Sequence, residues 1–156
     1  MVMKEILIAL ANQLRNYPDL SFASEYSYVA EDPYELMEQN RYPFWNIVPG
    51  DERREPLEEM SEVEMERHIY PITIQFATRS MRINVAVMGD PGNNIIGILD
   101  FSDHIYQAII FDRTLDNVVD GILPGSSVPR DYLKDDSMFI ARAEMTVEFY
   151  KDIGLL

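Results

Sequence analysis

Residues 139–149 read Phe-Ile-Ala-Arg-Ala-Glu-Met-Thr-Val-Glu-Phe, and this stretch decides the fold of the chain. Every second residue from Phe139 to Phe149 is apolar, and the residues between them are mostly polar. Because successive side chains of a strand point to opposite faces, the alternation predicts one long, half-buried strand. Residues 67–78 alternate in the same way and predict a matching strand, whose shared face holds His68, Tyr70, Ile72, Ile74 and Phe76.

Two helices are predicted from apolar residues at helical spacing. The first covers residues 3–16 and stops before Tyr17-Pro18, since the residue before a proline avoids the helical conformation. The second covers about 94–110, after a Gly-Asp-Pro-Gly-Asn-Asn turn whose asparagines can cap it. Its core-facing residues are predicted to be Ile95, Ile98, Leu99, Ser102, Ile105, Tyr106 and Ile109.

The remaining segments complete a mixed architecture. Further strands are predicted at 21–29, 42–48 and 81–88, and 112–137 is expected to be mostly loop with a short strand. An acidic stretch at about 50–67 is too polar for core and is expected to form a solvated loop or a hairpin arm. This order of elements predicts a single α+β domain over 1–156, with a mostly antiparallel sheet packed by an N-terminal helix and a central helix.

Composition narrows the possible functions. The chain has 156 residues, no cysteine and a formal net charge of −14, so disulfides, thiolate metal sites and cysteine nucleophiles are excluded. Negative charge repels phosphate backbones, and specific nucleic-acid binding is therefore not expected. No apolar run reaches the ~20 residues that a spanning helix needs, so we expect a soluble protein without a membrane partner.

Residues capable of catalysis or metal binding form no recognisable motif. His68 and His104 are the only histidines and lack the paired spacing of a metal site. The glycines of 89–94 lack the spacing of a phosphate-binding loop, and the acid pairs Glu58/Glu59 and Asp135/Asp136 lie in polar stretches. We therefore expect no enzyme activity, no cofactor and no metal.

An aromatic group, Tyr42, Phe44 and Trp45, allows two interpretations. Tryptophan and tyrosine are enriched in protein–protein hot spots, which makes the group a candidate interface. Packing of a strand against the core explains the same residues equally well.

The order of elements resembles the tail terminator proteins of long-tailed bacteriophages, also called tail-completion or head-tail joining proteins. The resemblance is architectural and covers most of the chain. It rests on the N-terminal helix, the strand Tyr-Pro-Phe-Trp-Asn-Ile-Val at 42–48, a charged loop, the strand at 67–78, the helix at 98–109 and the closing strand at 139–149. The segments 51–67 and 111–137 depart from that pattern in charge and in length.

The resemblance implies a structural virion subunit, assembled in the host cytoplasm and placed at the head-proximal end of the tail. It implies a self-assembled six-membered ring that caps the tail tube, stops its polymerisation and offers a surface to a head-completion or connector protein. DNA passes through such a ring, and negative charge would keep it from sticking. The charged arm supplies further candidate interface residues: Arg53, Arg54, Glu58, Glu59 and Glu62.

Two alternatives remain at this point. Another small tail or head-completion connector subunit would have similar elements, and a subunit of the tube itself would polymerise where a terminator does not. A small-ligand-binding domain would instead require a buried pocket that holds a carboxylate with a strongly shifted pKa.

Overall fold

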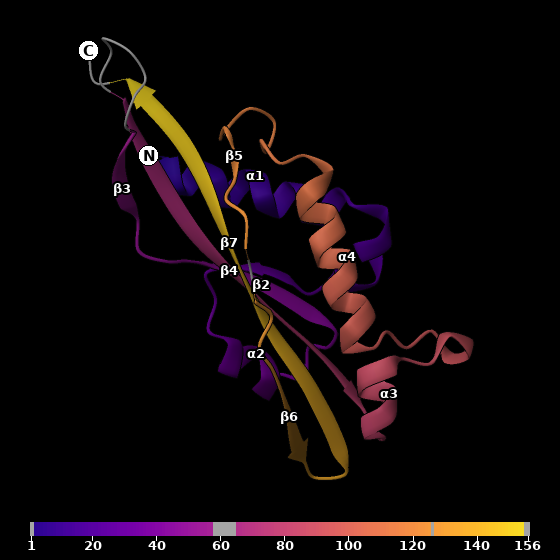
Figure 1. Ribbon diagram of the computed structural model, residues 1–156. Helices are drawn as coiled ribbons and strands as arrows, with labels where there is room; N and C mark the ends of the chain where they lie inside the picture. The colour runs from indigo at the N-terminus through magenta and orange to yellow at the C-terminus, as the bar shows by residue number, and fades with distance from the viewer. Residues whose placement is uncertain (1, 58–64, 126, 155–156) are drawn as a thin grey trace.

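The computed structural model describes residues 2–57, 65–125 and 127–154. Its backbone is a long, twisted antiparallel pair, β4 (Met65–Ser80) and β7 (Met138–Gly154), which crosses the whole molecule (Figure 1). The register runs from Met65 opposite Gly154 to Ser80 opposite Phe139 without a break. The two stretches with the clearest alternation are thus hydrogen-bonded partners, and the α+β prediction is confirmed.

Shorter strands line both sides of this pair. On the β4 side, β2 (Phe44–Pro49) and β3 (Arg53–Leu57) pair antiparallel with different parts of β4, and β1 (Ser27–Val29) pairs parallel with β2. On the β7 side, β5 (Gly121–Ile122) and β6 (Arg130–Asp135) pair antiparallel with β7. The sheet is therefore mostly antiparallel, as predicted.

Helices cover one face of the sheet and bury the alternating apolar rows. They are α1 (Val2–Asn16), the 3-10 segment η1 (Pro18–Ala23), α3 (Ile83–Met88) and α4 (Ile98–Phe111). A further 3-10 turn, η2 (Pro91–Asn93), precedes α4. The main core lies between these helices and the sheet, and its strand residues include Tyr70, Ile72, Ile74, Phe76, Ala141, Ala143, Met145, Val147 and Phe149. No helix among the described residues is long and apolar enough to cross a membrane.

The opposite face is only partly covered. The short helix α2 (Pro33–Glu38) inserts Leu36 against Phe44, Ala77 and Ile140, which form a second small core (Figure 1). Farther along, this face is polar, and the hydroxyls of Thr73 and Thr146 are 3.1 Å apart. Ile140 was predicted on the polar side of its strand, and α2 explains why an apolar residue lies there.

Four local predictions are wrong. Residues 83–88 form α3 rather than a strand, and most of 21–29 is 3-10 helix and turn, with only Ser27–Val29 in a strand. The helix predicted from 94 begins at Ile98, and its N-cap is Gly97 rather than an asparagine. Within α4, Tyr106 is 46% exposed, whereas Phe101, which was not predicted, is buried. Residues 112–137 contain two short strands, β5 and β6.

Candidate interaction surfaces

Strand β6 is an exposed edge of the sheet. It pairs with β7 on one side and has no strand partner on the other within the described residues. All six of its residues are exposed, including Tyr132 at 47% and Leu133 at 37%. Asp131 fixes the strand to β7 by accepting two 2.5 Å hydrogen bonds from the Arg142 guanidinium. Unpaired backbone N–H and C=O groups on such an edge are a template for another strand.

Strand β3 is also an edge, but its chemistry differs. Four of its five residues are exposed, and Pro56 removes one backbone donor from the ladder. The neighbouring side chains form ion pairs: Arg53 with Glu148 and Glu55, and Arg67 with Asp152. Proline and charge are the usual means by which proteins block strand addition at an edge.

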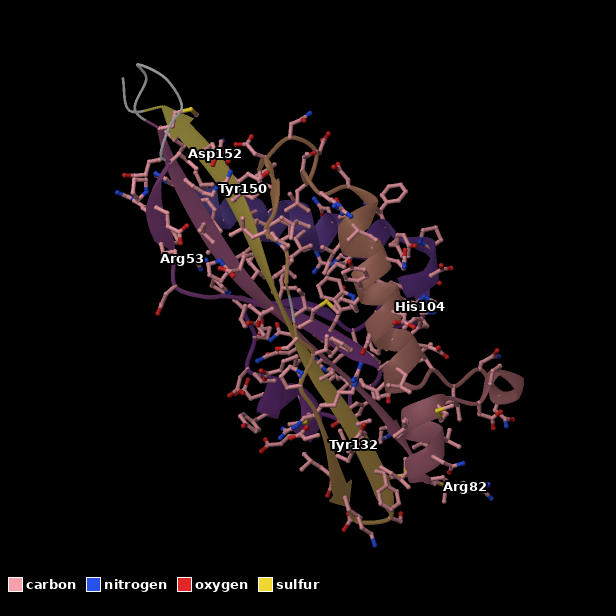
Figure 2. The ribbon with its side chains drawn as sticks, in the orientation of Figure 1. Arg53, Arg82, His104, Tyr132, Tyr150 and Asp152 are labelled. Atoms are coloured by element: carbon pink, nitrogen blue, oxygen red, sulfur yellow. The ribbon has the colours of Figure 1, made fainter. Side chains whose placement is uncertain are left out.

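The pair between Arg67 and Asp152 organises this end of the sheet. The guanidinium donates to both carboxylate oxygens, at 2.7 and 3.0 Å, and stacks 4.2 Å from the centre of the Tyr150 ring. Hydrogen bonding to Asp152 raises the pKa of the Arg67 guanidinium. Figure 2 shows Tyr150 and Asp152 together at this end, and Tyr132 and Arg82 at the other.

The aromatic candidates lie in the cores rather than on the surface. Trp45 is 0% exposed in the main core, and Phe44 is 2% exposed in the second core on the opposite face. The Tyr42 ring packs 5.7 Å from that of Phe44, and burial raises the pKa of Tyr42 to about 12. Core packing, the second interpretation of these residues, thus describes Phe44 and Trp45, and neither presents a side chain to a partner.

The charged candidates divide between the surface and the undescribed segment. Arg53 and Arg54 are exposed on β3, where Arg53 is ion-paired and Arg54 lies 4.0 Å from Glu66. Glu58, Glu59 and Glu62 lie outside the described residues. The strands β3 and β4 pair on either side of that segment.

A groove between α1 and the end of α4 was not predicted. It has a volume of about 620 Å³, and we call it the α1–α4 groove. Its apolar lining residues are Ile8, Ala9, Tyr17, Pro18, Phe111, Leu115 and Val118. The carboxylates of Glu5, Asp112 and Asp116 also line it, and no lysine, arginine or histidine belongs to its described lining.

Hydrogen bonds at the end of α4 fix the shape of this groove. The Gln13 amide donates to the carbonyls of Ala108, Ile109 and Asp112 at 2.8, 3.2 and 3.0 Å, which ties α1 to α4. Asp112 accepts from the Thr114 hydroxyl at 2.7 Å and from the N–H of Asp116 at 2.8 Å. These hydrogen bonds lower the pKa of Asp112.

Two smaller pockets lie beside β7. One, of about 350 Å³ between α2 and β6, has both apolar and charged lining residues and includes Tyr34, Arg130 and Arg142. The other, of about 260 Å³, lies beside α4 and includes Ile109 and Arg113. Among the described carboxylates, the resolved pKa shift is that of Asp112, and it is downward.

The predicted metal candidates do not converge within the described part of the chain. His68 lies in β4 with its Nε2 2.8 Å from Glu66, and His104 lies in α4 near the Phe22 ring. No group of three or more metal-ligating side chains occurs among the residues that the structure describes. The 89–94 turn is structural: Gly89 has a φ of 81°, and a Cβ on Gly97 would lie 2.3 Å from the Gly89 nitrogen.

No protein-family model matches the chain, and no curated protein matches it in sequence.

Proposed function

We propose that this protein is a structural assembly subunit, a phage tail terminator that forms a six-membered ring at the head-proximal end of the tail. In this proposal the ring caps the tail tube, ends its polymerisation and contacts a head-completion or connector protein. The observation that carries it is β6, an edge strand whose six residues are all exposed and include no proline, with Tyr132 and Leu133 between its charged ends. Such an edge is suited to contact with another chain.

The distribution of surfaces supports assembly in preference to catalysis. The α1–α4 groove, of about 620 Å³, lies on the outside of two helices and is lined mainly by apolar side chains, with carboxylates but no lysine, arginine or histidine among its described lining. Contacts that repeat from one copy to the next use two different surfaces of each copy, and they close into a ring when the rotation between copies allows. The edge of β6 and the groove are two such different surfaces.

The net charge of −14 also fits this role. A ring of acidic subunits repels the phosphate backbone of a genome that moves through it, so DNA passes without being held.

Electron microscopy of the purified protein tests the proposal. We expect closed rings with six-fold symmetry in class averages and no filaments at high protein concentration. Tubes that lengthen with concentration would instead favour a tube subunit, the second member of the same class. Addition of the rings to polymerising tail-tube protein should stop growth at the capped end, and tubes that grow unchanged would contradict the terminator role.

A further inference from the structure

Exposed apolar side chains gather at two separate places outside β6. Ile8 and Phe111, which are 52% and 76% exposed, line the α1–α4 groove. Met81 and Ile83, 70% and 41% exposed, lie where β4 passes into α3. We call the second group, residues 81–83, the α3 tip. Contiguous exposed apolar surface of this kind is typical of an interaction site.

The two places have complementary charge. The groove lining includes the carboxylates of Asp112 and Asp116, and no lysine, arginine or histidine belongs to its described residues. The α3 tip carries Arg82, which is exposed and whose guanidinium has no partner within the described part of the chain. An apolar segment with one positive charge therefore fits the groove in both hydrophobicity and sign.

The α3 tip of a chain cannot reach its own groove. The groove lies at the C-terminal end of α4, whereas α3 packs near the start of α4 (Figure 1). Since α4 has 14 residues, about 20 Å of rigid helix separates them. A contact between the two must come from another copy of the chain.

We propose that the α3 tip of one copy occupies the α1–α4 groove of the next. Met81 and Ile83 would pack against Ile8 and Phe111, and Arg82 would face the groove carboxylates. The contact is head-to-tail, because each copy offers its tip to one neighbour and its groove to the other. The inference deepens the proposed ring and rests on it, since it names the surfaces through which neighbouring subunits would join.

A mixing experiment with two variants tests this contact. Met81→Asp disables the tip and Phe111→Asp disables the groove, and both side chains are exposed enough to leave the core intact. Each variant alone should associate about tenfold or more weakly than wild type, because a buried carboxylate replaces an apolar anchor. A 1:1 mixture should form a dimer and nothing larger, because each pair retains one intact tip and one intact groove.

Sedimentation velocity measures these masses, and Arg54→Ser is the control. Arg54 is exposed on β3 and lies outside both the groove and the α3 tip, so its substitution should leave association unchanged. If Met81→Asp unfolds in a thermal melt, Arg82→Glu replaces it as the tip variant and should weaken association by a similar factor, whereas Arg82→Lys should not.

The outcomes separate this contact from the ring proposal. Variants that assemble as wild type does would overturn the tip-in-groove contact and leave the ring standing on other surfaces. A mixture of the two variants that stays monomeric would overturn the head-to-tail geometry. A wild-type chain that is monomeric at every concentration would overturn the tip-in-groove contact. Rings observed only on tail ends would still support the terminator role in that case.

Discussion

The two ends of the β4–β7 pair differ in the residues of the edge strand that each one carries, β3 at one end and β6 at the other. The β3 end is formed by 53–57, 65–69 and 150–154. Its outer strand contains Pro56, and side chains at this end form ion pairs. At the β6 end, formed by 77–83 and 130–143, Tyr132 and Leu133 are exposed on the edge strand, and Met81 and Ile83 are exposed at the α3 tip; Figure 2 labels Tyr132 and Arg82 at this end. One sheet thus has an edge strand that contains a proline and an edge strand that contains none, and we expect assembly at the second.

The largest expected effect is a loss of folding stability when a buried side chain is truncated in the middle of the sheet, between the two ends. Phe76→Ala should lower the free energy of unfolding by about 3–5 kcal/mol, because its ring is 1% exposed in the main core. Phe139→Ala, at the half-buried start of β7, is the matched comparison and should lower it far less. Urea denaturation measures both, and equal losses would show that the ends are as essential to folding as the middle.

Next in size is a change at the β6 end. Leu133→Lys should weaken self-association about tenfold, because it replaces an exposed apolar side chain of the β6 edge with a fifth charge. It should change the free energy of unfolding by no more than about 0.5 kcal/mol, since Leu133 is 37% exposed. Arg54→Ser on β3 is the control and should leave self-association as it is. If Arg54→Ser weakened association more than Leu133→Lys, the β3 edge rather than the β6 edge would be the one used in assembly.

A smaller effect is expected at the β3 end. Arg67→Ala removes the ion pair with Asp152 and the stacking on Tyr150, and it should destabilise the fold by less than about 1 kcal/mol. The pair is partly exposed, so the difference from wild type should shrink as salt is added. Thermal melts at low and high salt measure this, and a loss of self-association in this variant would count against a purely protective role for the β3 end.

The smallest effect is expected in the α1–α4 groove, which would receive the α3 tip of a neighbouring copy. The folded chain lowers the pKa of Asp112, so its contribution is fully present above the unfolded value of about 3.9. That contribution disappears as the pH falls through the lower folded value. Stability curves of wild type and Asp112→Asn should therefore differ slightly at neutral pH and converge in strong acid. Curves that stay parallel throughout would show that the Asp112 charge adds nothing.

The long strands and both main helices could be predicted because their periodicity is strict. Residues 83–88 were wrongly predicted as a strand because Ile-Asn-Val-Ala-Val-Met alternates and contains β-branched residues, and both features are typical of strands. Contacts outside the segment decide its conformation: Ala86 packs into the main core, and the Thr78 hydroxyl donates to the Ala86 carbonyl at 3.2 Å. A window of six residues cannot reveal such partners.

The interaction surfaces were largely beyond sequence reasoning. Phe44 and Trp45 are adjacent and point to opposite faces, and both are buried because α2 covers the second face. The residues of β6 show no apolar alternation, so only their pairing with β7 makes them a strand. The α1–α4 groove joins Ile8 to Phe111, which are distant in sequence. Ile8 lies within the first predicted helix, whereas Phe111 lies one residue beyond the second, so no periodic pattern in the sequence marks this groove.

The mass of the purified chain across a wide range of concentrations tests the central claim most directly. We expect a species of six times the 18.1 kDa chain mass, and no larger product as the concentration rises. A chain that remains monomeric throughout and does not stop tube growth, or one that forms an open series of ever longer polymers, would contradict it.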